Sequence, residues 1–188
     1  MEDAVSPRES TAPVTGEELL RMSWLNPCEL VCGRIVRMTP TNPTHGRIEA
    51  NVAAALRAFV RTQNLGVVMA GEVGIFTTRN PDTVRAADVL FLSHERDALR
   101  TRRDGFLEVA PDLVVEILSP TDRPDAVRRK LDEYFAAGVR MAWVIDPATR
   151  TVRVHRPNGD VRSVAAGEVV AGDDVLPGFV LPVDEVFE

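Results

Sequence analysis

Three acidic residues, Glu72, Asp88 and Glu116, occupy strand-like stretches that are otherwise almost entirely apolar. Side chains alternate between the two faces of a β-strand, and this alternation puts each carboxylate in line with apolar neighbours. A buried, ionised carboxylate is costly unless it is paired with a cation or bound to a metal. Three strands that each tolerate one therefore indicate a shared cation, and Mg²⁺ or Mn²⁺ takes such oxygen ligands.

A purely structural explanation exists for each carboxylate taken alone. Any one of them could lie at the end of a strand and reach solvent, or could pair with one of the many arginine side chains. The metal hypothesis therefore depends on all three carboxylates meeting in one place.

Lys130 is the only lysine in the chain, and every other basic side chain is an arginine. It lies in a predicted helix over residues 122–138, at the border of the apolar stripe, whereas Arg129 points away. The helix directly follows the strand that carries Glu116, so the ammonium can reach the carboxylates. There it can orient or deprotonate a water, or stabilise charge on a phosphate. The alternative is a surface lysine whose stem borders the core.

The pattern of apolar residues predicts the elements that must position these groups. A capping box of Thr15 and Glu18 opens a short helix, and Gly33 separates two short strands as in a hairpin. A spacing near 3.6 predicts a long helix that ends before Gly66, and Asp122 is expected to cap a second one. The other predicted strands cover residues 67–77, 84–93, 112–119, 141–147 and 150–157. This order predicts a mixed β-sheet flanked by helices, of the α/β or α+β class.

Composition bounds the kind of protein. At 188 residues, 45% of them hydrophobic, the chain can form one domain, expected over residues 15–188 after a disordered tail over residues 1–14. No apolar run resembles a signal peptide or a membrane span. With only Cys28 and Cys32 and scattered histidines, we expect a reduced, cytoplasmic protein without a zinc site. The net charge of −6 argues against non-specific coating of nucleic acid but leaves room for a local basic site.

Two blocks of sequence carry a family resemblance. The first runs from PDLVVEILSP through DAVRRKLDEYFAAGVRMAWVIDP to TVRVHRP, and the second, upstream, includes ELVCGRIVRM, HGRIEANVAAAL, GEVGIF and AADVLFLS. In this order, over residues 16–185, they resemble the Uma family of restriction endonucleases, part of the PD-(D/E)XK nuclease superfamily. The resemblance implies a restriction-endonuclease-like core, a mixed β-sheet flanked by helices.

The resemblance also implies roles for the residues at matching positions. Asp88 takes the place of the family's metal-binding aspartate, Glu116 that of its core-strand glutamate, and Lys130 that of its lysine. In most of the superfamily the lysine follows the glutamate by two residues, where this chain has Leu118, so here it has moved to the next helix. Ala87 replaces the proline that usually precedes the aspartate, which changes backbone stiffness rather than chemistry.

We therefore expect a metal-dependent endonuclease that hydrolyses DNA. Asp88 and Glu116, with Glu72 at a matching acidic position, would hold Mg²⁺ or Mn²⁺, and Lys130 would position the attacking water. His45 opens the first long helix, either as a substrate contact or as a helix-start residue. A rim of arginines would approach the DNA: Arg96, Arg100, Arg102, Arg103, Arg123, Arg128 and Arg129. The alternative is that these side chains only solvate a loop and a helix face.

The resemblance suggests a homodimer, because restriction-type nucleases commonly pair to cut both strands. Two rival functions remain at this stage. One is a catalytically silent nuclease-like fold that serves as a binding or assembly module, and the other is a small-molecule hydrolase with the same metal chemistry. The retained carboxylates and the lone lysine favour the enzyme, because a silent module would be free to lose them.

Overall fold

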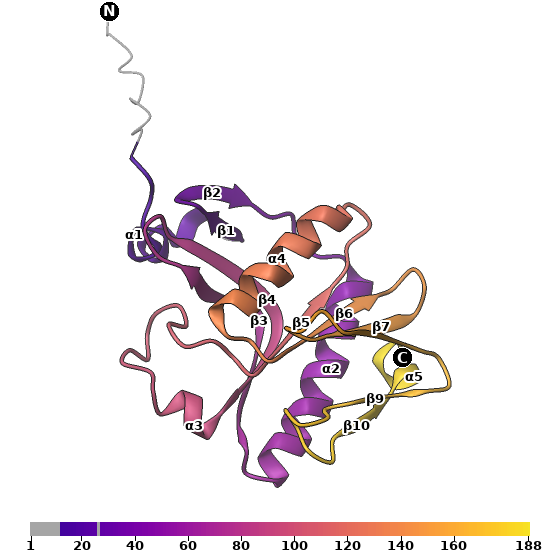
Figure 1. Cartoon of the computed structure of the whole chain (residues 1–188). Helices are drawn as coiled ribbons and strands as arrows, with labels where there is room; N and C mark the ends of the chain where they lie inside the picture. Colours follow the sequence, from indigo (N-terminus) through magenta and orange to yellow (C-terminus); the bar gives the residue numbers. More distant parts are fainter. Residues whose placement is uncertain (1–11, 26) are drawn as a thin grey trace, which may run out of the picture.

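The structure is a computed structural model that describes residues 12–25 and 27–188. Most of the expected N-terminal tail, residues 1–11, lies outside the described residues. The backbone N–H of Val14 already donates to the carbonyl of Gly33. From there the described chain builds a large mixed sheet with helices on both faces (Figure 1). None of the described helices is long and apolar enough to cross a membrane.

Eight strands form the main sheet in the order β2-β1-β4-β5-β6-β7-β8, and β3 pairs with β4 outside this path. They are β1 (Cys28–Val31), β2 (Arg34–Arg37), β3 (Gly66–Thr78), β4 (Thr83–Ser93), β5 (Leu113–Ile117), β6 (Met141–Asp146), β7 (Thr151–His155) and β8 (Val161–Ala165). β5 and β6 run parallel, joined by the crossover helix α4 (Pro124–Ala137), and the other pairs are antiparallel. The central strands read as continuous apolar runs because both of their faces are covered.

Elements from different parts of the chain cover the two faces. One face packs against α2 (Pro43–Thr62), the β9–β10 pair (Val169–Ala171 and Val180–Pro182) and α5 (Val183–Val186). The other packs against α4, and Figure 1 shows α4 and α2 on opposite sides of the sheet. The remaining helical segments are α1 (Gly16–Arg21), the 3₁₀ turn η1 (Ser23–Leu25) and α3 (His94–Asp97).

Strand β4 changes partner along one of its edges. β3 pairs with it along almost its whole length, so β1 and β5 share the opposite edge. β1 meets it at Leu30 opposite Val84, and β5 pairs with it only from Val89 onward. Residues 85–88 therefore face a fork between β1 and β5, where this edge of β4 has no strand partner.

The predicted fold class and most of the predicted elements are confirmed. The capping box of α1, the β1–β2 hairpin, α2 and the strands β3 to β7 lie where the sequence placed them. Asp122, however, does not cap α4, because its carboxylate accepts the N–H of Ser119 and the N-cap residue is Arg123. The strict alternation assumed for β3 is also wrong at Glu72, which has φ 51° and lies with Gly71 in a β-bulge.

Candidate active site

Ionisable side chains replace the missing strand in the fork between β1 and β5. The N–H of Ala86 donates to Glu29 Oε1 at 3.0 Å, and the carbonyl of Ala86 accepts from Lys130 Nζ at 2.8 Å. Buried backbone groups need partners, and here a carboxylate and an ammonium supply what a neighbouring strand supplies elsewhere. The backbone of β4 thereby fixes both side chains in the fork.

Asp88 bridges β4 to β5 just beyond their last paired residues. Its Oδ2 accepts the N–H of Ile117 at 2.6 Å, and the same oxygen lies 3.3 Å from Nε2 of His45, in the first turn of α2. The hydrogen bond to Asp88 outweighs burial and raises the pKa of His45. His45 therefore contacts Asp88 as well as lying in the first turn of α2.

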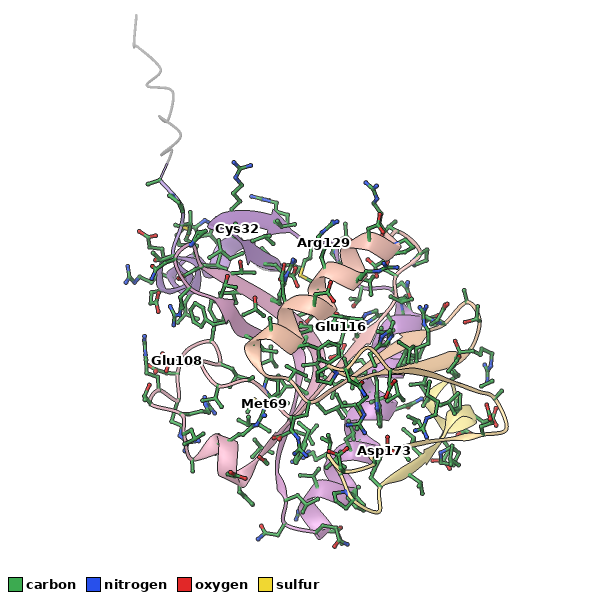
Figure 2. All side chains as sticks on the ribbon, in the orientation of Figure 1. Cys32, Met69, Glu108, Glu116, Arg129 and Asp173 are labelled. Carbon is green, nitrogen blue, oxygen red and sulfur yellow. The ribbon has the colours of Figure 1, made fainter. Side chains whose placement is uncertain are left out.

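Glu116 and Lys130 meet in the space between β5 and α4, and Figure 2 shows Glu116 close to this helix. Lys130 Nζ donates to Glu116 Oε2 at 2.6 Å, and the hydroxyl of Tyr134 donates to Oε1 at 2.8 Å. Burial, together with the nearby carboxylate of Asp88, raises the pKa of Glu116 to about 7 against the opposing effect of Lys130. Burial lowers the pKa of Lys130, but Glu116 and Glu29 outweigh it, so the ammonium stays charged. The lone lysine thus lies among carboxylates, where helical geometry placed it.

Glu29 and Arg85 complete a buried network that the sequence analysis missed. Glu29 Oε1 lies 3.1 Å from Lys130 Nζ, and its Oε2 accepts from Arg85 Nη1 at 2.7 Å. Glu133 of α4 holds the other side of Arg85 through bonds of 2.5 and 2.9 Å. Burial raises the pKa of Glu29, but Lys130, the N–H of Ala86 and Arg85 together bring it below its ordinary value. Glu29 could have been found from the sequence, because it is an acidic residue in the apolar run of β1, and the same pattern identified Glu116.

A second acidic group approaches Asp88 from the other edge of β4. The bulge in β3 puts Gly71 and Glu72 opposite Asp88. Glu49, one turn after His45 on α2, accepts the N–H of Gly71 at 2.8 Å. Burial raises the pKa of Glu49, and the charges of Asp88 and Glu72 raise it further. The strand register therefore puts Glu72 opposite Asp88, and the structure adds Glu49, for which the sequence analysis had no role.

One hollow of about 410 Å³ is lined by Asp88, Glu116, Lys130 and His45. Within the described residues, no three His, Cys, Asp or Glu side chains form a ready-made metal site. Mg²⁺ needs fewer protein ligands, because it is commonly held by one or two carboxylates together with waters and substrate phosphates. Asp88 helps to raise the pKa of Glu116, and two carboxylates that repel each other in this way gain from a shared cation. This pair fits a hard divalent cation such as Mg²⁺ or Mn²⁺.

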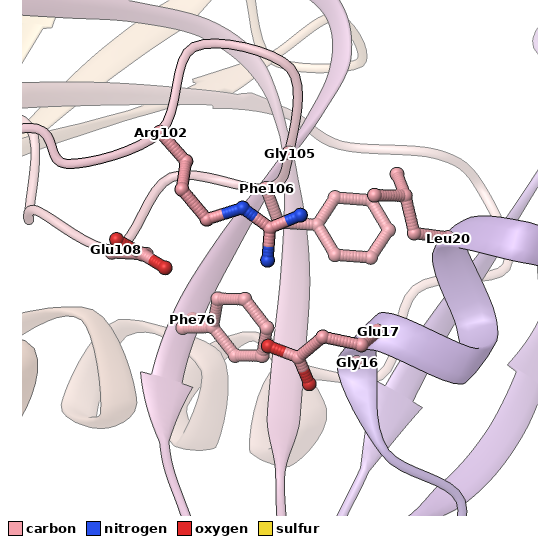
Figure 3. A pocket seen from close by; sticks show the side chains of 8 residues that line it. All are labelled: Gly16, Glu17, Leu20, Phe76, Arg102, Gly105, Phe106 and Glu108. Carbon is pink, nitrogen blue, oxygen red and sulfur yellow. The ribbon is translucent and has the colours of Figure 1, made fainter.

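The predicted arginine rim divides into two groups. One belongs to α3 and the loop after it and consists of Arg96, Arg100, Arg102 and Arg103. These arginines interact with other residues of the same chain. Arg96 forms an ion pair with Asp112, and Arg100 and Arg103 form ion pairs with Asp97. Arg102 lines a small hollow with Phe76 and Phe106 beside α1 (Figure 3). This loop adjoins the start of β5, at the opposite end of that strand from Glu116. The other group is exposed at the start of α4 and consists of Arg123, Arg128 and Arg129.

Comparisons with known proteins agree with this architecture. The sequence model of the Uma2 family, described as "Putative restriction endonuclease", matches residues 17–184. Among solved structures, the chain is similar to "a putative nuclease belonging to DUF820 from Anabaena variabilis ATCC 29413", with 22% identity and a TM-score of 0.78 over 93% of this chain and 98% of that chain. At that identity the likeness shows the fold alone. No curated protein is significantly similar in sequence. Because the family match spans nearly the whole described chain, this chain belongs to the Uma2 family.

Proposed function

We propose that the protein is a metal-dependent endonuclease that hydrolyses phosphodiester bonds in DNA. The observation that carries the proposal is the meeting of Asp88 and Glu116 in one hollow, with Lys130 bonded to Glu116 at 2.6 Å. Phosphodiester hydrolysis with a divalent cation calls for carboxylates to hold the cation and for positive charge beside the phosphate. Membership in the Uma2 family supports the same reaction class.

Asp88 and Glu116 would hold Mg²⁺ or Mn²⁺, and Glu72 is the further candidate ligand because the bulge puts it opposite Asp88. When bound, the cation would supply Lewis acidity and a water of lowered pKa. His45 lines the same hollow, so it would contact the substrate phosphate. Burial of Glu116 and Lys130 keeps their charges poorly screened, which strengthens their effect on a reacting phosphate.

Lys130 Nζ donates to the carbonyl of Ala86 and to Glu116, and it forms an ion pair with Glu29 at 3.1 Å. An ammonium has three donors, and these three groups already surround it, so Lys130 would hold the attacking water in exchange for one of these contacts. The Ala86 carbonyl belongs to β4, and Glu29 is fixed by Arg85. Glu116 is the partner that lines the hollow, so the water would take its place on the ammonium. In this way Lys130 would both hold Glu116 at rest and position the water.

The route for DNA would lie along the start of α4, where the exposed arginines Arg123, Arg128 and Arg129 can contact backbone phosphates. Cutting both strands of a duplex calls for two sites, which a homodimer would supply. We place the protein in the cytoplasm, where Cys28 and Cys32 would stay reduced, and the two are not joined by a disulfide.

Incubating the protein with plasmid and single-stranded DNA in Mg²⁺ or Mn²⁺ tests the proposal. Cleavage should need the metal and should vanish in Asp88→Asn and Glu116→Gln, which keep the size of the side chains. Lys130→Arg keeps the charge between the carboxylates but presents its N–H groups differently, so it should fold and lose most of the cleavage. Circular dichroism and the melting temperature check that each variant is folded.

Cleavage that survives in folded Asp88→Asn or Glu116→Gln would refute this site. A wild type that binds metal at these residues but cuts no DNA would refute the endonuclease and favour the binding or assembly module.

A further inference from the structure

The loop between β5 and α4 separates three hollows, and Ser119 lines all of them. One is the catalytic hollow that contains Asp88 and Glu116. A second, of about 610 Å³, lies between α4 and one face of β6 to β8, and we call it the α4–β7 hollow. It shares Ser119 and Asp122 with the catalytic hollow. The third shares Asn42, His45 and Ser119 with the catalytic hollow. A DNA strand held in the catalytic hollow would thus adjoin two further cavities that share part of its lining.

The α4–β7 hollow exists because α4 covers only part of its face of the sheet. Among the described residues, the core beneath α4 takes strand residues from β3 to β6 and none from β7 or β8. α4 contributes Leu131 and Phe135 to the hollow, and β6 contributes Val144. These side chains make an apolar floor beside the uncovered strands.

The wall opposite α4 is basic and contains an unsatisfied donor. Arg153 and His155 of β7 are two residues apart, so both point from the strand toward this hollow. Nε of Arg153 is buried and has no hydrogen-bond partner among the described residues. Arg153 lines the hollow, so its positive charge faces this cavity even though Nε itself is covered. Burial and the charge of Arg153 lower the pKa of His155.

We propose that the α4–β7 hollow binds an unpaired nucleobase of the substrate strand, next to the phosphate held in the catalytic hollow. The inference rests on the proposed nuclease function. A base offers a flat apolar face to the floor and the His155 ring, and an edge with acceptors to the guanidinium group of Arg153. Arg128, also at this hollow, would contact the adjoining phosphate.

The shape of the hollow then limits the substrate. A base that is stacked and paired within a duplex cannot enter a cavity walled by a helix and a sheet, and must first leave the stack. The preferred substrate is therefore single-stranded DNA, or a duplex with an unpaired nucleotide beside the cut.

Binding of a single-stranded oligonucleotide that contains 2-aminopurine, in EDTA, tests the inference without turnover. Anisotropy gives the affinity, and the emission of the reporter base shows whether it changes environment. Arg153→Leu should weaken binding about tenfold or more and abolish the change in emission, because one base contact has about this effect. Val161→Trp should do the same by filling the hollow from its rim, where Val161 is 55% exposed and the fold tolerates a larger side chain.

Arg162→Leu is the matched control. It removes the same charge from the neighbouring strand β8, but Arg162 pairs with Val154 and Arg153 with Ser163, so the two arginines point to opposite faces. Arg162→Leu should bind the oligonucleotide as the wild type does.

Equal affinity and emission in wild type, Arg153→Leu and Val161→Trp would overturn the base site. So would an Arg153→Leu variant that dissociates a dimer in sedimentation while its affinity for DNA is unchanged, because the hollow would then be an interface between copies. Cleavage is measured separately, so the two proposals fail separately. Base binding that depends on Arg153 in a protein that cuts no DNA would uphold the hollow and refute the nuclease. Normal cleavage by Arg153→Leu, with unchanged binding, would refute the hollow alone.

Discussion

Replacing Glu29 by glutamine probes how the fork is held together. The change keeps the shape of the side chain and removes one negative charge from between Lys130 and Arg85. In the wild type Glu29 lies 2.7 Å from Arg85 Nη1 and 3.1 Å from Lys130 Nζ, and it is only 8% exposed. A hydrogen bond to a charged group contributes about 1.5–3 kcal/mol. With two such contacts weakened, the free energy of unfolding should fall by about 2–4 kcal/mol.

Glu133→Gln is the matched control for this variant. Glu133 binds the other side of the same arginine at 2.5 and 2.9 Å, and its side chain is 27% exposed. A pair that is closer to solvent contributes less, about 1 kcal/mol or below. Urea unfolding near neutral pH, followed by circular dichroism, measures both variants. A loss in Glu29→Gln no larger than that in Glu133→Gln would refute the idea that Glu29 and Lys130 depend on each other.

The difference between wild type and Glu29→Gln should also depend on pH. Burial raises the pKa of Glu29, but Lys130, the N–H of Ala86 and Arg85 outweigh it and bring the folded-state pKa below the ordinary value of 4.5. A carboxylate with a lowered pKa contributes stability above its unfolded pKa and loses it as the pH falls through the folded one. The difference in unfolding free energy should therefore be full near neutral pH and should shrink below pH 4.5. A difference that persists in acid would contradict a charge effect.

Three further predictions concern the catalytic hollow and its approach. Tyr134→Phe should reduce the free energy of unfolding by about 1–2 kcal/mol, because Glu116 loses its hydroxyl donor; an unchanged urea midpoint would contradict this. Mn²⁺ should raise the melting temperature of the wild type and leave that of Asp88→Asn unchanged, and equal shifts would remove Asp88 from the metal site. DNA affinity should fall steeply with salt, and Arg128→Ser should reduce the slope of log affinity against log salt by about 1. Arg100→Ser should leave that slope unchanged. Arg100 is paired with Asp97, and this segment adjoins the start of β5, at the opposite end of that strand from Glu116.

The parts of the site that could be predicted from sequence depend on local periodicity. The two-residue period of β5 gives the face of Glu116, and the helical period of α4 gives the face of Lys130, so their contact follows once the helix packs on the sheet. The same reasoning fails at Glu72. A β-bulge inserts a residue opposite Asp88 and changes the direction of the side chain, and the only local sign of it is Gly71.

The remaining parts depend on contacts between distant segments. Glu29 enters the site only because β1 pairs with β4 at Leu30 and Val84 and then leaves the edge open, which no local pattern records. The arginine rim shows the opposite error, in which residues predicted to lie at the site lie away from it. Arg96 and Arg103 are close in sequence to β4, but the antiparallel β4–β5 pair carries them to the end of the sheet opposite Glu116.

The fork also accounts for a lysine on a helix instead of the usual position two residues after the glutamate. Ala86 has no strand partner on this edge, so its carbonyl needs a donor, and an ammonium from α4 supplies it while bonding Glu116 and Glu29. The proposed function therefore joins a structural and a catalytic role in Lys130. Lys130→Ala would leave Glu116 without its cation and the carbonyl of Ala86 without its donor, and breaking a buried pair costs about 3–5 kcal/mol, so loss of activity in that variant would not separate chemistry from folding. Two other variants do separate chemistry from folding. Lys130→Arg keeps the positive charge and changes the geometry of its N–H donors. Glu29→Gln keeps the Lys130 ammonium and removes one of the carboxylates that hold it in place.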